Sequence, residues 1–428
     1  MSSPAAATPS TGTDAAGRAR ARRAVVAASM GNALEWFDII VYAFMAPVIQ
    51  KLFFPALGDT LGLVVTFGLF GVSYLIRPLG AIVLGSYGDR RGRKAALTLT
   101  IALMTFGVAL MAFAPTYATI GIAAPLLIVV SRLVQGFSAG GEFGSATAFM
   151  TENSPDRKAF YASWQVATQG ASMFLAATAG FLLNTVVSPE TLLAWAWRLP
   201  FVFGLLIGPI GLWIRLHMDD TPEFLAAETV DSPLGTTFVR HMPRVLVAAM
   251  CVGVATMSVY LITYLPTFAQ RNLGLPPWSG YAGAIVAGLI ALVGSPFVGR
   301  LADRVGQTRI MLTAALVGLV VAFPMFALLT GTPRVSTLIV AEIILGALMA
   351  AYFAPLPSLL AAMFPVQIRT TGMSLAYNIG VTLLGGFAPT VLAWLVTYDL
   401  RAPSFYYIGV AVLSIVGLVL ARRVYGQR

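Results

Sequence analysis

Two acidic residues, Glu35 and Asp38, lie three positions apart in the apolar stretch GNALEWFDIIVYAF. Helical spacing places both carboxyl groups, together with Asn32 and Tyr42, within an arc of about 120° on one helix face. Two carboxylates on one face repel each other, and this raises the affinity of at least one of them for a proton. The pattern therefore predicts a proton carrier. Permanent pairing of one or both acids with a buried cation is the structural alternative.

Two arginines, Arg77 and Arg132, lie within other apolar stretches, SYLIRPLGA and SRLVQGFSAGGEFG. Because a guanidinium group stays ionised when it is buried, each arginine must find an anion. Glu35, Asp38 and Glu142 could supply that anion, and so could a carboxylate of a bound substrate. When one of these acids takes up a proton, an arginine becomes free for a bidentate contact with such a substrate. This coupling favours a carboxylate over a neutral sugar as the cargo.

Neutral polar side chains extend this candidate site. Gln165 and Gln169 share one helix face, where hydrogen bonding between helices is an equally good explanation. Tyr260, Tyr264 and Tyr377 are possible polar lining in the second half of the chain, although ordinary packing is favoured for each tyrosine. The candidate substrate-binding residues are Asn32, Tyr42, Arg77, Arg132, Gln135, Gln165, Gln169, Tyr264, Tyr377 and Asn378. The proton-coupling candidates are Glu35, Asp38 and Glu142, of which Glu142 is also a candidate gate residue.

The composition indicates which elements must position these residues. The chain is 58% hydrophobic and 10% charged, with a mean hydropathy of +0.83. Apolar runs of this length predict an all-α polytopic membrane protein. The twelve expected spans are residues 24–53, 61–85, 95–114, 120–150, 158–185, 198–217, 244–268, 280–300, 309–330, 337–362, 370–397 and 404–422. One cysteine and two separate histidines predict no metal site and no cofactor.

A repeated glycine-rich turn divides the chain into two six-helix halves. The first copy, GSYGDRRGRK, occupies residues 85–94, and a weaker copy, GRLADRVGQTR, occupies residues 299–309. The equivalent Asp89 and Asp303 are half the chain length apart, which indicates a duplication. Glycines let two helix ends approach closely, and an aspartate at a helix end can pair with a neighbouring arginine. The predicted conformational gate comprises Gly85, Asp89, Arg90, Gly92, Arg93, Gly299, Asp303 and Arg304.

Charge distribution predicts the topology. With the N-terminus assigned to the cytoplasm, 20 of the 27 Lys and Arg residues fall in cytoplasmic segments, and five fall outside. This asymmetry places both termini in the cytoplasm and leaves the membrane lipid as the one implied polyanion, so a nucleic-acid partner is not expected. The expected organisation is a tail at 1–23, an N-terminal half at 24–217, a central loop at 218–243, a C-terminal half at 244–423 and a short tail at 424–428.

Both turns resemble the loop between helices 2 and 3 of the major facilitator superfamily. The stretches GNALEWFDIIVYAF, RLVQGFSAGGEFG, DRKAFYASWQ, WRLPF and MDDTPEF narrow the resemblance to the metabolite–proton symporter family. Members of that family import citrate, 2-oxoglutarate, shikimate and other organic acids, or proline and betaine, together with protons. One departure is Gln307-Thr308-Arg309, where the family pattern is similar to Gly-Arg-Arg/Lys, so a weaker charge network is expected there.

The resemblance implies a secondary transporter of the bacterial inner membrane and not an enzyme. The leading expectation is proton-coupled import of a small organic acid, such as a di- or tricarboxylate, by alternating access. Symport of a zwitterion such as proline or betaine is the alternative within this class, and a non-transporting membrane sensor is the alternative outside it. The proton gradient would take the place of a cofactor, and the functional unit is expected to be a monomer.

Overall fold

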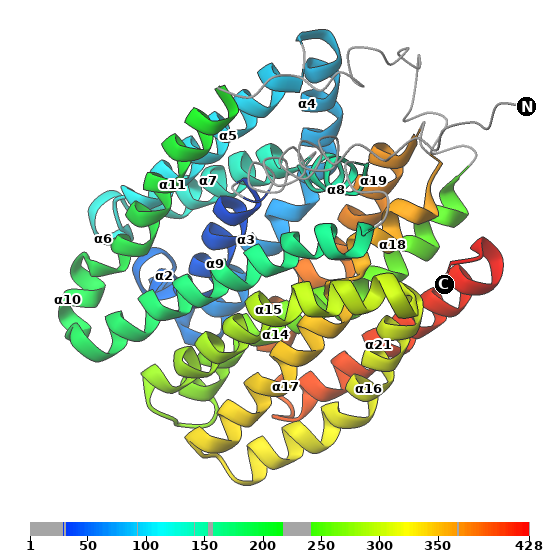
Figure 1. Cartoon of the computed structure of the whole chain (residues 1–428). Helices are drawn as coiled ribbons and strands as arrows, with labels where there is room; N and C mark the ends of the chain where they lie inside the picture. Colours follow the sequence, from blue (N-terminus) through cyan, green and yellow to red (C-terminus); the bar gives the residue numbers. More distant parts are fainter. Residues whose placement is uncertain are drawn as a thin grey trace, which may run out of the picture.

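The computed structural model describes residues 29, 31–91, 93–140, 142–152, 157–216, 241–365 and 368–427. Across these ranges the chain forms helices and turns without any strand, and the helices group into a bundle of two halves (Figure 1). The expected tail at 1–23 and most of the expected loop at 218–243 lie outside the described residues. The all-helical class predicted from the hydropathy pattern is confirmed.

The elements of the N-terminal half follow a first helix, Gly31–Phe44. They are α2 (Ala46–Phe53), the 3-10 turn η1 (Pro55–Leu57), α3 (Gly58–Leu75), α4 (Arg77–Arg91), α5 (Arg93–Ala112), α6 (Tyr117–Ile120), α7 (Ala123–Ala139), α8 (Glu142–Glu152), α9 (Lys158–Val186), α10 (Pro189–Ala194), the 3-10 turn η2 (Ala196–Arg198) and α11 (Leu199–Leu216). The C-terminal half comprises α14 (Met242–Arg271), α15 (Pro277–Val305), α16 (Gln307–Gly331), α17 (Val335–Phe353), α18 (Leu356–Met363), α19 (Arg369–Val381), the π turn η4 (Thr382–Gly386), α20 (Ala388–Leu395) and α21 (Ala402–Tyr425).

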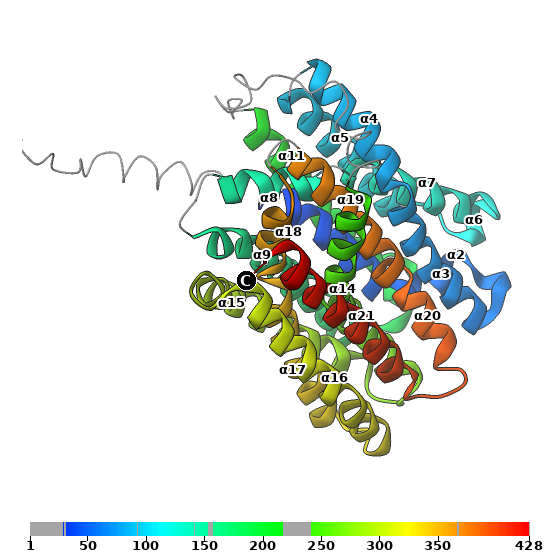
Figure 2. The same ribbon diagram turned by 90° about the vertical axis from the view of Figure 1, so that its right-hand side faces the viewer.

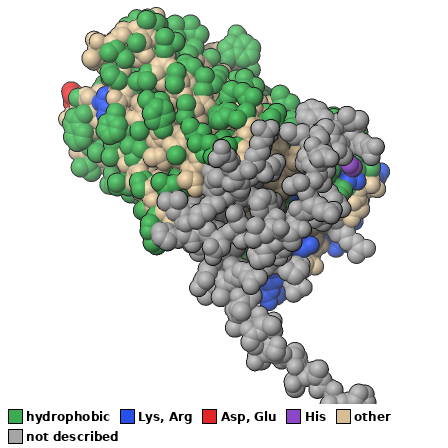
Figure 3. All heavy atoms as spheres, turned by 90° about the horizontal axis from the view of Figure 1, so that it is seen from above, with side chains coloured by type: hydrophobic (Ala, Val, Ile, Leu, Met, Phe, Trp, Pro, Cys, Tyr) green, Lys and Arg blue, Asp and Glu red, His purple; other side chains and the backbone are tan. Residues whose placement is uncertain are grey.

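Among the described residues, these helices provide eleven candidate spans and one shorter apolar helix, which together match the twelve expected spans. Ten segments are long and apolar enough to cross a membrane, and the first helix with α2 forms an eleventh, bent span. The twelfth is α5, whose apolar part, Thr98–Ala112, is shorter than the others. Exposed apolar side chains such as Leu126, Trp213 and Val320 cover much of the described surface, as contact with lipid requires (Figure 3).

Several spans are broken where the sequence predicts continuous helices. The first span, expected to be one helix over 24–53, bends by 65° at Met45. Pro47 lies in the first turn of α2, where its missing N–H costs nothing, so the chain restarts there in a new direction. The expected span 370–397 is interrupted by the π turn η4 beside Gly385 and Gly386. Span 337–362 is interrupted as well: α17 ends at Phe353, and α18 restarts at Leu356 between Pro355 and Pro357.

The two halves meet most extensively where α9 packs along α15, which lie side by side in both ribbon views (Figures 1 and 2). Gly170 and Gly288 allow this approach, since a Cβ on Gly170 would lie 2.4 Å from the backbone nitrogen of Leu292. We call this contact the α9–α15 seam. A second contact between the halves lies where α14 ends. There Arg271 donates to Gln50 Oε1 at 2.9 Å and to the Asp59 carbonyl at 3.2 Å. Both ends of the bundle therefore have contacts between the halves.

Candidate transport site

The first part of the site is an ion pair between Arg77 and Glu35. An Nη2 atom of Arg77 lies 2.7 Å from Glu35 Oε1, and both side chains are buried. Arg77 is placed at the start of α4, directly after the break that ends α3, and Pro78 follows it in the first helical turn. The guanidinium carbon also lies 4.1 Å from the centre of the Tyr74 ring, one turn earlier in the chain. The Tyr74 hydroxyl is hydrogen-bonded to that of Tyr260 on α14, which links this pair to the other half.

A second ion pair joins Arg132 of α7 to Asp38 of the first helix. Arg132 Nη1 lies 3.1 Å from Asp38 Oδ2, and Nη2 lies 3.4 Å from Oδ1. Gln135 Nε2 donates to the same Oδ1 at 3.4 Å. The guanidinium carbon lies 4.2 Å from the centre of the Tyr42 ring. Each acid of the first helix is therefore paired with its own arginine. Pairing with a buried cation was the structural alternative to a proton carrier in the sequence analysis.

The two pairs differ in their access to space. A small cavity between the halves has room for about one water molecule. Its lining residues are Asn32, Glu35, Trp36, Arg77, Glu142, Phe143, Ala146, Gln165 and Tyr377. Arg132 and Asp38 do not line it; both are buried within the N-terminal half, at about 2% exposure. The Arg77–Glu35 pair therefore lines the cavity, and the Arg132–Asp38 pair does not.

Residues of the two halves close this cavity. The rings of Phe143 and Tyr377 are stacked, with centroids 3.6 Å apart and an interplanar angle of 2°. Beside them, Asn378 Nδ2 donates to the Gly140 carbonyl at 3.1 Å. The cavity has no room for even a small dicarboxylate, so this is a closed conformation of the bundle. A substrate can enter after the halves have moved apart.

The remaining candidates take different places. Asn32 donates to the Gln165 carbonyl at 2.9 Å, and the Gln165 side chain accepts from Thr147 at 3.0 Å. The buried amide of Gln169 has no hydrogen-bond partner within the described ranges, and it does not line the cavity. Tyr264 lies apart from the cavity, with its ring 5.8 Å from that of Phe67, and acts in packing. Four of the candidate substrate-binding residues line the cavity, namely Asn32, Arg77, Gln165 and Tyr377. The other six do not: Tyr42, Arg132, Gln135, Gln169, Tyr264 and Asn378.

Sequence reasoning missed several aromatic residues of the site. Trp36 and Phe143 line the cavity, and Tyr74 supports Arg77. A spacing signal for Tyr74 was present, since it lies three residues before Arg77 on one apolar segment. Phe143 carried no such signal, because its role depends on stacking with a residue of the other half.

The predicted gate is described in its second copy. Asp303, near the end of α15, accepts hydrogen bonds from the backbone N–H groups of Ala159 at 2.8 Å and Phe160 at 3.0 Å. These N–H groups begin α9, so Asp303 caps a helix of the other half. Gly299 lies against the same turn, where a Cβ would come within 2.8 Å of the Ala159 carbonyl. Arg304 is exposed.

The first copy of the gate lies largely outside the described residues and side chains. Gly92 lies outside the described residues, and so do the side chains of Asp89, Arg90 and Arg93 and the surroundings of Gly85. The expectations for these five residues therefore stay predictions.

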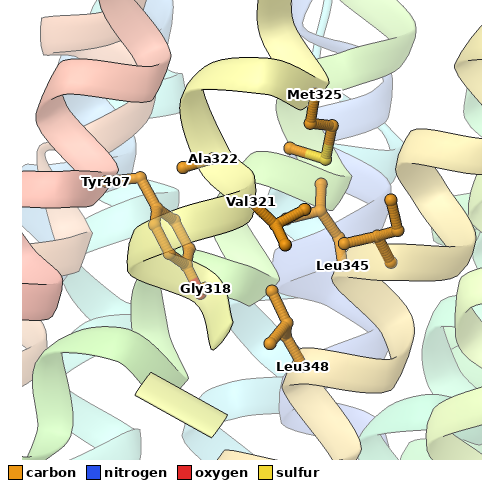
Figure 4. A pocket seen from close by; sticks show the side chains of 8 residues that line it. Gly318, Val321, Ala322, Met325, Leu345, Leu348 and Tyr407 are labelled. Atoms are coloured by element: carbon orange, nitrogen blue, oxygen red, sulfur yellow. The ribbon is translucent and has the colours of Figure 1, made fainter. Parts of the chain in front are cut away.

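A second crevice lies within the C-terminal half, between α16, α17 and α21 (Figure 4). Its lining residues are Gly318, Val321, Ala322, Met325, Ile344, Leu345, Leu348 and Tyr407. None of them carries a charge, and no water-sized space is left between them. This crevice has nothing with which to recognise an ionic substrate.

The family model of the Major Facilitator Superfamily matches residues 28–333 and 284–428, which together span nearly the whole chain. The chain belongs to the major facilitator superfamily. A citrate-proton symporter of Klebsiella pneumoniae is 34% identical over 389 residues, covering 90% of this chain and 88% of the relative. A proline/betaine transporter of Escherichia coli (strain K12) is 34% identical over 412 residues, covering 92% of this chain and 82% of the relative.

Solved structures of the superfamily have the same fold. The proton:xylose symporter XylE, bound to 6-bromo-6-deoxy-D-glucose, gives a TM-score of 0.76 at 13% identity, covering 95% of this chain and 96% of that one. At this identity the match establishes the fold alone. It confirms the prediction of a major facilitator fold with two six-helix halves.

Proposed function

We propose that this protein is a proton-coupled symporter that imports a small organic acid by alternating access. We place it in the bacterial inner membrane as a monomeric functional unit, with both termini in the cytoplasm. The relatives named above are a citrate-proton symporter and a proline/betaine transporter, which both carry small molecules. The excess of Lys and Arg in the segments assigned to the cytoplasm supports the orientation.

The observation that carries the proposal is the Arg77–Glu35 pair in the wall of the cavity. In the empty, closed protein the two charges neutralise each other. Protonation of Glu35 removes the anion, and Arg77 then remains as a buried cation that must be compensated. A substrate carboxylate supplies that compensation through a charge-assisted contact. Proton binding and anion binding thus favour each other.

Glu142 contributes a second carboxyl group to the same cavity. It begins α8, directly after the point where α7 ends, close to the Phe143–Tyr377 stack that joins the halves. This position suits a residue that responds to opening of the cavity. We assign Glu142 to the coupling of substrate entry with movement of the halves.

A zwitterionic substrate is the second candidate, and one feature favours it. Trp36, Phe143 and Tyr377 give the cavity aromatic walls. Aromatic faces attract quaternary ammonium groups, while Arg77 would take the carboxylate of the same molecule. Betaine and proline share this pairing of one cation with one carboxylate.

The proposal is tested by uptake into proteoliposomes with an imposed pH gradient, acid outside. Radiolabelled citrate, 2-oxoglutarate and shikimate represent the acids, and proline and betaine represent the zwitterions. Accumulation of an acid above equilibrium that collapses with a protonophore supports the main proposal. Accumulation of zwitterions alone would transfer the assignment to the second candidate, and no accumulation of any of them would count against both.

A further inference from the structure

A glutamate of the C-terminal half is buried away from the site described above. Glu342 lies on α17, and its side chain is fully enclosed. Neither carboxyl oxygen has a hydrogen-bond partner among the residues that the structure describes. The side chain is packed against Gly283 of α15, where a Cβ would come within 2.6 Å of Glu342 Cγ.

Among the residues that the structure describes, none on the helices around Glu342 forms an ion pair with it. On α14, Tyr260 bonds to Tyr74, and Arg271 bonds to Gln50, both in the other half. On α15, the Tyr281 hydroxyl donates to the Phe44 carbonyl at 3.1 Å. The charged residues of α15 and α16 are confined to 300–309, at the other end of these helices, and those of α9 lie in its first turn. The short helix α18 carries no titratable side chain.

An ionised carboxylate in such surroundings would be strongly disfavoured. Burial removes its hydration, and within the described part of the chain no donor or cation replaces the lost water. A neutral carboxylic acid has a much lower desolvation penalty and fits against the glycine backbone. Glu342 therefore holds a proton in this closed conformation.

The position of Glu342 connects it with closure of one end of the bundle. It is seven residues from the start of α17, about 10 Å along the helix. Gly283, which covers it, is two residues from Tyr281, whose hydroxyl binds the first helix of the other half. This is the same end at which Arg271 joins Gln50 and Asp59. When the contacts of Tyr281 and Arg271 with the other half break, the start of α15 can move. Gly283 then no longer packs tightly against the carboxyl group of Glu342.

We propose that Glu342 is a proton-binding site that makes closure of this end dependent on pH. The opening step rests on the alternating access proposed above, whereas the bound proton does not. Glu342 binds its proton more tightly when this end is closed than when water reaches it. The closed form is therefore favoured at low pH and is lost as the pH rises. One linked proton changes the ratio of closed to open molecules by up to about tenfold per pH unit.

The bound proton is tested by infrared difference spectroscopy on the purified protein in lipid vesicles. The C=O stretching band of a protonated carboxyl group should be present at neutral pH and should be lost in Glu342→Gln. Glu190→Gln is the matched control. Glu190 is exposed on α10, and hydrogen bonds from its own backbone N–H and from Ser188 lower its pKa, so it is ionised and contributes no such band. An unchanged band in Glu342→Gln would overturn the proposal, whether or not the protein transports any acid.

The linkage to closure is tested with spin labels at Thr60 and Asn272, which flank the contact of Arg271 with Asp59. Cys251, which is buried, is replaced by alanine so that labelling is specific. The population at short distance should fall as the pH rises, and this dependence should vanish in Glu342→Gln and in Glu342→Leu. Glu190→Gln should keep it. A pH dependence that persists in both Glu342 variants would overturn the proposal.

Discussion

The two arginines of the N-terminal half have the same kind of partner but different surroundings. Arg77 and Glu35 line the cavity between the halves, whereas Arg132 and Asp38 are enclosed among Gln135 and Tyr42. The first pair can exchange its anion for a substrate without leaving the cavity. The second pair holds the first helix to α7. This difference separates the roles of residues that look alike in the sequence.

Replacement of the two acids should separate these roles. Glu35→Gln should leave the protein folded and abolish accumulation driven by a pH gradient, because the amide cannot carry the proton. Asp38→Asn should lower the yield of folded protein, because removing one partner of a buried pair costs about 3–5 kcal/mol. Uptake per folded transporter, with the folded amount measured by size-exclusion chromatography, checks both results. Normal accumulation by Glu35→Gln would exclude Glu35 as the carrier.

Replacement of Arg77 should weaken substrate binding more than replacement of Arg132. Lysine keeps the charge but loses the planar fork, so Arg77→Lys should weaken binding of the transported carboxylate by more than about tenfold, or roughly 1.4 kcal/mol. The sequence predicts the same loss for Arg132→Lys, but its distance from the cavity leads us to expect less than threefold. Arg334→Lys, at an exposed position, serves as the control. Unchanged affinity in Arg77→Lys, measured by calorimetry, would show that Arg77 has a structural role.

At the residue scale the sequence identified the charged side chains within the spans, but it did not predict how they pair. The cost of a charge within an apolar segment identified Glu35, Asp38, Arg77 and Arg132, because such residues need a reason to be there. Their partners depend on how helices rotate and pack, which spacing along one helix does not determine. Phe143 could not be found for the same reason, since it matters through its stacking with Tyr377.

Two charged residues that line the cavity, Arg77 and Glu142, are the first residues of their helices. Arg77 follows a break at Ile76, and Glu142 begins α8 after α7 has ended. Hydropathy predicted the spans but not these breaks, because a proline or glycine within an apolar run is compatible with a continuous helix as well as a bent one. The 65° bend at Met45 was missed in this way. Side chains at such breaks gain freedom that the middle of a regular helix does not offer.

Asp303 provides the test at the scale of elements. Asp303→Asn removes the negative charge at the start of α9 and weakens its two hydrogen bonds, so closure of this end should weaken by about 1 kcal/mol, roughly fivefold. Substrate affinity should be unaffected, because the cap lies at the end of α15. The fuller motif around Asp89 predicts a larger effect for Asp89→Asn on conformational exchange. Exchange rates from single-molecule fluorescence check the ranking, which a more severe defect in Asp303→Asn would contradict.

At the scale of the whole molecule, the α9–α15 seam decides how closely the halves approach. Backbone meets backbone there at Gly170 and Gly288, so no side chain can yield if atoms are added. A seam of this kind fixes the spacing of α9 and α15 in this conformation. The seam could not be predicted from the sequence, because neither Gly170 nor Gly288 belongs to a four-residue glycine repeat, and only packing selects these two among 41 glycines.

Gly288→Ala should therefore destabilise the closed conformation. The added Cβ would lie 2.7 Å from the backbone nitrogen of Phe174, and overpacking of this kind costs about 1–3 kcal/mol. Gly409→Ala is the matched control, because a Cβ at this helical position meets no atom within 4 Å. Distances between spin labels on the two halves should lengthen in Gly288→Ala and stay as in the wild type in Gly409→Ala. Equal distances in both variants would show that the seam does not limit closure.

The pairing of Arg77 with Glu35 has a consequence for the electrical behaviour of the transport cycle. In the empty protein the two opposite charges cancel, so this pair moves no net charge when the halves exchange. The membrane potential, which does about 2.3 kcal/mol of work per elementary charge at 100 mV, therefore does not act on the pair during the return step. Voltage acts instead on the loaded step, through whatever charge the substrate and its protons leave uncancelled. The Arg77–Glu35 pair should accordingly contribute no electrical current during the return of the empty protein.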